Sequence, residues 1–276
     1  MKKIFAVCMM MMMMMMMMMI FSGCGKDTSA QIDGSSTLEG EKIIIGMDDE
    51  FPPISFHDEK NNLVGFDVDL AKEAARRMKV EIEFKHIDWD KKKEAITSGS
   101  VDMIWNGLDI TEERKEYMIF TKPYMDDRQI LLVKEGNGLD IASEGDLEGK
   151  IVGTQAGSTS DDYINANESL KETFKDYKTY VYFGQVLDAL KGGVIDVIIC
   201  DELIARYEAN QNPGQLELVN IKIGSVAEMA VGFAKDKTGL RDKVQAAFDE
   251  MVADGTAKKI SERWFKADVI RQSWDS

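Results

Sequence analysis

One arginine in the chain has neighbours that suit the recognition of an anion. Arg114 follows Thr111-Glu112-Glu113, and its planar guanidinium can bind a carboxylate through two hydrogen bonds. Thr111 is a good N-cap, and the two glutamates suit a first helical turn. We therefore expect Arg114 at a helix start, where backbone N–H groups also favour an anion. On the residues alone, the alternative is a surface arginine that pairs with those glutamates.

Two further stretches place polar groups where ligands gather. Asp201 directly follows the apolar run 194–200, and ligands of α/β sheets collect at the carboxyl ends of strands. On the residue alone, however, an N-cap for a helix over residues 201–209 is the favoured reading of Asp201. Gly157-Ser158-Thr159 is a turn that enters a helix, whose first backbone N–H groups can hold a carboxylate. An ordinary capped helix start is the alternative there.

Composition excludes several other classes of protein. The chain has 276 residues and a formal net charge of −15, which argues against nucleic-acid binding because phosphates require a basic surface. Two histidines and three cysteines are too few for a Cys/His zinc site or a disulfide framework. We expect no metal and no cofactor. Cys200 lies in an apolar run and is expected to be an inert buried thiol.

The first forty residues resemble the export signal of a bacterial lipoprotein. Lys2 and Lys3 precede an uncharged apolar stretch over residues 4–21, and Phe21-Ser22-Gly23-Cys24 is similar to a lipobox. The resemblance implies a signal peptide over residues 1–23 and acylation (palmitate) at Cys24, which would hold the protein on the extracytoplasmic face of the membrane. A plain N-terminal membrane anchor is the alternative. Residues 24–40 carry the lipidated cysteine and a polar, Ser/Gly-rich tether.

Strand and helix patterns alternate after residue 41, which predicts an α/β fold with mostly parallel sheets. We expect two lobes, one over residues 41–127 plus 231–276 and the other over residues 128–230, joined by two crossover segments that form the hinge. The expected strands are 42–46, 80–84, 101–105, 129–133, 150–154, 179–183, 194–200, 215–223 and 230–234. The expected helices are 66–78, 90–98, 161–168, 185–191, 201–209, 240–253 and 258–265.

Several motifs in this order resemble one family. Gly65-Phe66-Asp67-Val68-Asp69-Leu70, followed by Ala74-Ala75, is similar to the signature of bacterial extracellular solute-binding proteins of family 3, the receptors of ABC importers for polar amino acids. Further similar stretches are 46–53, 98–102, 109–114, 120–124, 153–162 and 194–201. The resemblance covers about residues 41 to 266. It implies a two-lobed periplasmic-binding-protein-like fold.

The same resemblance implies a function and its partners. Such a protein binds an amino acid in the cleft between its lobes and presents the closed form to a permease and an ATPase. Closure requires only that the ligand binds the closed state better than the open one. We therefore expect a monomeric, membrane-anchored receptor that is not an enzyme.

The resemblance also assigns roles to individual residues. Arg114 and Thr159 would contact the ligand carboxylate, and Asp201 would bind its α-ammonium. The other candidate ligand contacts are Phe51, Trp89, Asp48, Asn106, Gly107, Ser158 and Asp109. The acidic residues Asp48, Glu50 and Asp109 would favour a ligand with a cationic side chain.

Asp109 departs from the family pattern, which usually has Ser or Thr there. A fixed negative charge at that position would repel a carboxylate. Three arrangements are open: Asp109 points away, it pairs with Arg114, or the ligand differs from a simple α-amino acid. An enzyme on the same fold, similar to the cyclohexadienyl or arogenate dehydratases, is the alternative function, with Asp109 as an acid–base group.

Overall fold

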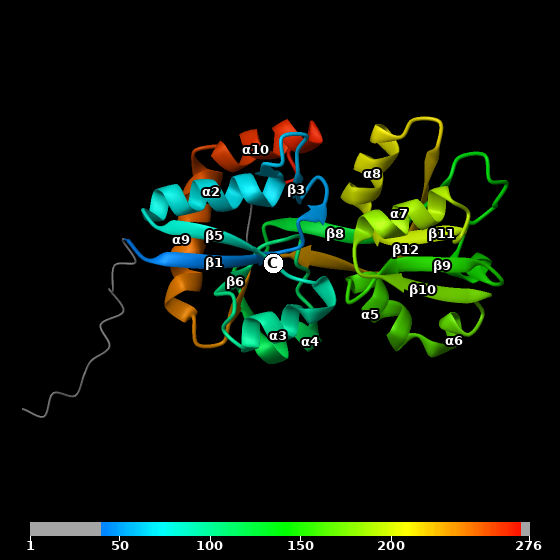
Figure 1. Ribbon diagram of the computed structural model, residues 1–276, viewed down its shortest axis with the longest axis horizontal. Helices are drawn as coiled ribbons and strands as arrows, with labels where there is room; N and C mark the ends of the chain where they lie inside the picture. The colour runs from blue at the N-terminus through cyan, green and yellow to red at the C-terminus, as the bar shows by residue number, and fades with distance from the viewer. Residues whose placement is uncertain (1–39, 272–276) are drawn as a thin grey trace, which may run out of the picture. The chain divides into compact units, whose positions relative to one another are not determined.

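The computed structural model describes residues 40–271 (Figure 1). Its first sheet has the strand order β5-β1-β6-β13-β7. β1 pairs in parallel with β5 and β6, as the predicted β-α-β-α-β pattern requires. The later strands β7 and β13 add antiparallel pairs. The bounds are Lys42–Met47 for β1, Glu81–His86 for β5, Met103–Ile104 for β6, Met118–Phe120 for β7 and Gly232–Ala234 for β13.

The second sheet has the order β10-β9-β11-β8-β12. β9 (Ile151–Gln155) pairs in parallel with β10 (Asp176–Tyr180) and β11 (Val197–Asp201), whereas β8 (Met125–Lys134) is antiparallel to β11 and β12 (Leu216–Met229). β8 carries the chain from the first sheet to the second, and β12 carries it back (Figure 1). A small third sheet joins β2 (Glu50–Phe51), β3 (Ser55–His57) and β4 (Leu63–Val64).

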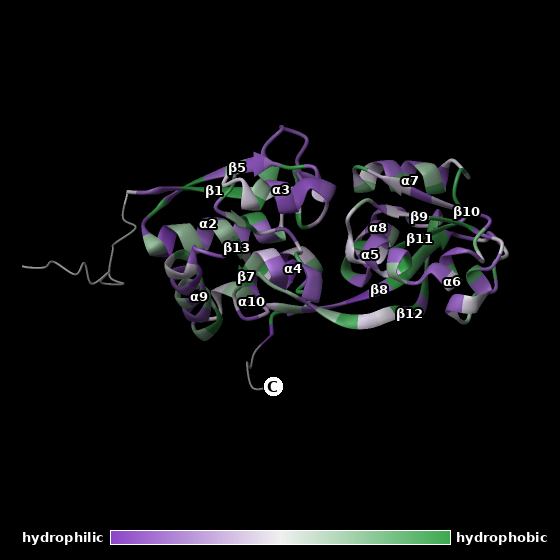
Figure 2. Cartoon of the chain, turned by 90° about the horizontal axis from the view of Figure 1, so that it is seen from below, coloured by the Kyte–Doolittle hydropathy of each residue, from purple (hydrophilic) through white to green (hydrophobic). Residues whose placement is uncertain are grey.

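Alternating apolar residues bury both faces of the sheets, as successive strand residues point to opposite sides. In β1, Ile43 and Ile45 belong to one core and Ile44 packs against another. β11 is likewise shared between two cores and stands out as hydrophobic in Figure 2. The helices are α2 (Phe66–Met78), α3 (Lys92–Thr97), α4 (Glu112–Tyr117), α5 (Thr159–Ala166), α6 (Glu168–Lys171), α7 (Phe183–Lys191), α8 (Glu202–Gln211), α9 (Thr238–Ala253) and α10 (Thr256–Phe265), with short 3-10 turns η1 (Trp89–Lys91) and η2 (Glu144–Leu147).

The signature that begins at Gly65 has a direct structural purpose. Gly65 has a φ of 146°, and a Cβ there would lie 2.1 Å from the backbone oxygen of Ile54, so only glycine fits. α2 follows, and its buried Asp67 accepts hydrogen bonds from the Gly107 N–H at 2.6 Å and the Tyr124 hydroxyl at 2.9 Å. Asp67 therefore fixes the loop that carries Gly107.

Most of the predicted elements are present, and α2 has the predicted bounds. The prediction of a strand over residues 179–183 was wrong at its end, because β10 stops at Tyr180 and Phe183 begins α7. Tyr182 and Gln185 form a capping box there, and a short apolar run does not by itself distinguish a strand from a helix start. The strand predicted over 215–223 continues to Met229. The small third sheet, β7, η2 and α6 were not predicted.

The predicted signal peptide, Cys24 and nearly all of the tether lie outside the described residues. Within residues 40–271, no helix has both the length and the apolar character needed to cross a membrane. The predicted lobe boundaries stay a prediction, although each of the two larger sheets lies mainly in one of the predicted lobes.

Candidate ligand-binding site

One pocket is lined by residues from both large sheets and their loops. All ten predicted ligand contacts line it, namely Asp48, Phe51, Trp89, Asn106, Gly107, Asp109, Arg114, Ser158, Thr159 and Asp201. Their roles as ligand contacts stay predictions. The sequence reasoning missed seven other lining residues, which are Gln129, Thr154, Gln155, Ser160, Phe183, Ile199 and Cys200.

Strand ends explain how distant residues meet in this pocket. Asp48 follows β1 and Asn106 follows β6, while Gln155 ends β9 and Asp201 ends β11. These strands are parallel within each sheet, so their carboxyl ends lie at one edge, where ligands of α/β folds bind. The same rule would have identified Gln155, because it directly follows the strand predicted over residues 150–154.

Arg114 is buried, and protein acceptors surround its guanidinium. Thr111 caps α4 by accepting the Arg114 N–H at 3.1 Å, as predicted. Nη1 donates to the Asp109 backbone oxygen at 3.0 Å, and Nη2 lies 3.2 Å from the Asp162 carboxylate. Nη1 and Nη2 also reach the Thr159 hydroxyl and the Gly157 carbonyl, both at 3.4 Å. Of its three nitrogens, Nε alone is buried without a partner in the described structure.

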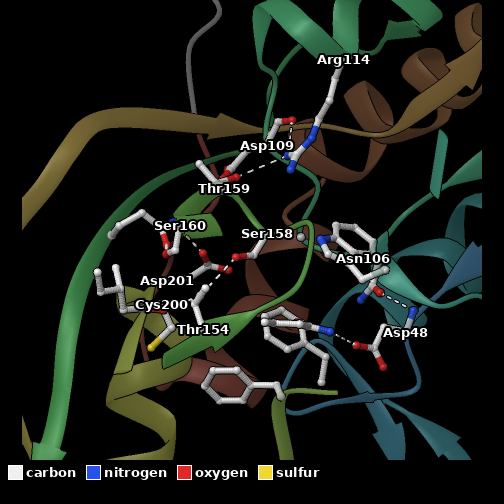
Figure 3. Close-up of a pocket in the computed structure, with 17 residues that line it drawn as sticks. Asp48, Asn106, Asp109, Arg114, Thr154, Ser158, Thr159, Ser160, Cys200 and Asp201 are labelled. Atoms are coloured by element: carbon white, nitrogen blue, oxygen red, sulfur yellow. Dashed lines mark hydrogen bonds between the residues drawn. The ribbon is translucent and has the colours of Figure 1, made fainter. Parts of the chain in front are cut away.

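Asp109 lines the pocket and does not turn away from it (Figure 3). Its Oδ2 accepts a hydrogen bond from the Thr159 hydroxyl at 2.5 Å. Arg114 bonds to the backbone oxygen of Asp109 and pairs with the carboxylate of Asp162. The first of the three open arrangements is thus not observed, and the carboxylate contacts the other lobe through Thr159.

Asp201 stands at the N-cap position of α8, but its side chain makes no capping hydrogen bond. Its Oδ1 instead accepts from Gln129 Nε2 at 2.6 Å, and the same amide nitrogen lies 2.7 Å from Asp127 Oδ2. Asp127 and Gln129 are two residues apart in β8 and are both buried. Residues 126–129 are all polar, so no alternation in the sequence singles out these two residues.

Three predicted contacts use their side chains or backbone to hold the pocket together. Asn106 accepts the Asp48 N–H at 2.6 Å and donates to the Ser55 hydroxyl at 2.7 Å. Ser158 caps α5 by accepting the Asp161 N–H at 3.1 Å, which is the ordinary helix start considered from the sequence. Gly107 has a φ of 57° and donates its N–H to Asp67.

Aromatic rings and one acidic side chain line another part of the pocket. Phe51 and Phe183 meet edge to face with ring centroids 5.6 Å apart, and the buried Trp89 lines the same pocket. Asp48 Oδ2 accepts from Gln155 Nε2 at 2.6 Å. This part of the pocket therefore has apolar walls and one carboxylate.

Burial dominates the electrostatics of the acidic groups. It raises the pKa of Asp201 to about 7, with the nearby charge of Asp109 adding to the rise. Burial also raises the pKa of Asp109, opposed by Arg114, and raises that of Asp48. Burial lowers the pKa of Lys92 to about 8 and holds that of the Cys200 thiol well above its usual range. Among the ionisable residues that line the pocket, the acidic ones, Asp48, Asp109 and Asp201, outnumber the basic one, Arg114.

Comparison with known proteins points to one family. The model of the bacterial extracellular solute-binding proteins, family 3, matches residues 43–267. The chain is similar to the L-cystine-binding protein TcyJ of Escherichia coli (strain K12), with 31% identity over 83% of this chain and 84% of TcyJ.

Two solved structures extend the comparison to three dimensions. One is a substrate-binding protein of an ABC uptake transporter from Streptococcus pneumoniae with bound histidine, with a TM-score of 0.78, 33% identity, and coverage of 83% of this chain and 94% of that one. The other is the ancestral amino acid-binding protein AncCDT-1, a precursor of cyclohexadienyl dehydratase, with a TM-score of 0.74, 29% identity, and coverage of 81% and 95%.

Proposed function

Since this chain belongs to the bacterial extracellular solute-binding proteins of family 3, we propose that it is the receptor of an ABC importer for an amino acid. It binds the amino acid between its two lobes and delivers it to a permease and an ATPase. The observation that carries this proposal is a single pocket that joins Arg114 from one lobe to Thr159 and Asp201 from the other. A ligand that contacts both sides stabilises the closed state.

Each end of an amino acid has a matching group in this pocket. The ligand carboxylate is held by Arg114 Nε and by the first backbone N–H groups of α5, which have no acceptor within the helix. The α-ammonium binds Asp201. The ligand side chain extends toward Phe51, Trp89 and Asp48. The carboxylate of Asp48 favours a polar or cationic side chain there.

Closure follows from the lobe boundaries that the sequence suggested. Residues 41–127 plus 231–276 move against residues 128–230. The hinge consists of the two crossover segments, one near residues 126–129 at the start of β8 and the other near residues 230–231 after β12. Contacts between the two parts support a closed arrangement, since Gln155 binds Asp48 and Lys92 Nζ lies 2.5 Å from the Gly157 oxygen. The receptor works as a monomer in this scheme.

Export and membrane attachment complete the proposal. Residues 1–23 are a signal peptide, and Cys24 is acylated and anchors the protein at the extracytoplasmic membrane face. We expect Cys24→Ser to abolish incorporation of an alkyne-labelled fatty acid and to release the protein from the membrane fraction, because the thiol is the acceptor. Cys200→Ser is the control, since Cys200 is buried. Continued labelling of Cys24→Ser would contradict the assignment.

A thermal-shift panel on the full chain in detergent tests the receptor function. The panel contains the common amino acids, ornithine and cystine. A ligand at 100 times its Kd stabilises the folded state by about 2.7 kcal/mol, which is a readily measured shift. Stabilisation by a chemically related group of amino acids is the expected result. No stabilisation by any amino acid would refute the proposed function.

The dehydratase-like enzyme is the second candidate, and the similarity to AncCDT-1 is the observation that favours it. Burial raises the pKa of Asp109, as an acid–base group would require. Formation of product from prephenate or arogenate by the full chain would support the enzyme. Amino acid binding without turnover would exclude it in favour of the receptor.

A further inference from the structure

Three carboxylates from different parts of the chain converge beside the pocket. Asp109 comes from the loop after β6, Asp127 from β8, and Asp201 from the end of β11. One potential ligating oxygen from each lies within 4.8 Å of the other two. We call these three residues the acid triad. Asp109 and Asp127 are only 2% and 5% exposed, so water contributes little to their solvation.

The acid triad has more acceptors than the protein satisfies. Oδ1 of Asp109 and Oδ1 of Asp127 are buried without a hydrogen-bond partner in the described part of the chain. The donors that reach the triad from outside it are neutral, namely the Thr159 hydroxyl, the Gln129 amide and the Arg128 backbone N–H, and Asp127 and Asp201 also bond to each other. A buried carboxylate without a charged donor is costly to keep ionised. Within residues 40–271, no cationic side chain donates a hydrogen bond to a carboxylate of the triad, although the charge of Arg114 acts on Asp109 and Asp201.

Arg114 does not fill this need. Its Nη atoms donate to the Asp109 backbone oxygen and to the Asp162 carboxylate, and neither donates to a carboxylate oxygen of the triad. The missing partner is thus a cation that enters from outside, and it has to supply several donors within a small space.

We propose that the acid triad recognises the primary ammonium group of the ligand, so that Asp109 and Asp127 join Asp201 in setting specificity. An R–NH₃⁺ group has three N–H donors on one atom, which matches one oxygen from each carboxylate. The site therefore takes primary amines and discriminates against secondary and fully substituted ones, such as proline, N-methyl amino acids and betaines. This inference rests on the proposed amino acid receptor function.

The charge of the triad favours the same class of ligand. A group with one positive charge and three donors favours the ionised form of these carboxyl groups, whose pKa values burial raises, and satisfies both unpartnered oxygens. An N-methyl group replaces one donor with an apolar surface and leaves a buried carboxylate oxygen unpaired, which is the situation that gives strong discrimination in binding sites.

Calorimetric titration of the full chain in detergent tests the proposal. The probes are the panel amino acid that gives the largest thermal shift and its Nα-methyl derivative. For the wild type we expect the Nα-methyl compound to bind at least tenfold more weakly. We expect Asp109→Asn and Asp127→Asn each to weaken the parent amino acid at least tenfold and to reduce its preference over the Nα-methyl form.

Asp126→Asn is the matched control, because Asp126 is the neighbour of Asp127 on β8 but has an exposed side chain that faces Arg271. It should bind as the wild type does. Circular dichroism melting of the ligand-free variants confirms the fold, and the Nα-methyl comparison on the wild type remains decisive even if a variant fails to fold.

Other outcomes would overturn the inference. Equal binding of the Nα-methyl compound, or unchanged affinity in both triad variants, would show that the triad does not contact the ammonium. Stabilisation by Ca²⁺ or Mg²⁺ alone, lost in Asp127→Asn, would assign the triad to an inorganic cation. If no panel amino acid binds the wild type, the receptor function itself fails, which is a distinct result.

Discussion

Gly157 approaches the opposite lobe so closely that an added methyl group should oppose closure. Gly157 has a φ of 69°, and a Cβ built on it would lie 2.8 Å from the Asp90 Cα and 3.1 Å from Lys92 Nζ. Gly157 lies between β9 and α5, whereas Asp90 belongs to η1 beside the first sheet. In Gly157→Ala the distance between the new Cβ and the Asp90 Cα has to widen from 2.8 Å to about 3.4 Å, where ordinary van der Waals contact begins.

This substitution has two free-energy costs, and only one of them changes the affinity for the ligand. The left-handed backbone costs alanine about 1–2 kcal/mol in both open and closed forms. The contact with Asp90 exists only when the lobes are together, and overpacking of this kind costs about 1–3 kcal/mol. Amino acid binding requires closure, so we expect the affinity of Gly157→Ala to fall about 5- to 150-fold.

Gly193→Ala is the matched control for the backbone term. Gly193 has a φ of 71°, lies in the same lobe, and has nothing within 4 Å of its added Cβ. Both variants should lose a similar free energy of unfolding in urea without ligand. Only Gly157→Ala should bind its amino acid more weakly in calorimetry. Equal affinities in the two variants would refute the argument that closure brings Gly157 against Asp90.

Two further predictions follow from buried charged groups. Arg114→Lys should weaken amino acid binding at least tenfold in the same calorimetric assay, because an ammonium cannot replace the Nε donor or the planar guanidinium; unchanged affinity would refute carboxylate recognition by Arg114. Burial raises the pKa of Asp67 to about 7, so its stabilising contribution is full below about pH 4 and is lost as the pH rises through 7. The ligand-free unfolding free energy should therefore fall between about pH 4 and 7, and Asp67→Asn should flatten this slope; an identical slope would contradict the assignment.

Local patterns made much of the fold predictable. The helical spacing of apolar residues gave α2 its bounds, and the cap at Thr111 placed Arg114 in the first turn of α4. Each of these features depends on residues within a few positions of one another, so a single sequence contains the information. The small third sheet was missed because its strands have only two or three residues, which is too short for a period to appear.

Long-range pairing created the part of the site that was missed. Gln129 meets Asp201 because β8 and β11 pair antiparallel with those two residues opposite each other, although 72 positions separate them. Asp127 enters through the same strand. Nothing near either residue in the sequence announces that contact, since it depends on the register of two strands. The end of a strand was predictable, but the partner across the sheet was not.

The acid at position 109 raised doubt from the sequence because it would repel a ligand carboxylate. The geometry offers a physical resolution. Thr159 covers Oδ2 with a hydroxyl, and Arg114 holds the backbone oxygen of the same residue, so only Oδ1 remains unpartnered. An amino acid can then approach with its ammonium toward the acid triad and its carboxylate toward Arg114 Nε. In that orientation Asp109 attracts the ligand ammonium, and the charge that looked unfavourable sets the direction in which the amino acid lies between the acid triad and Arg114.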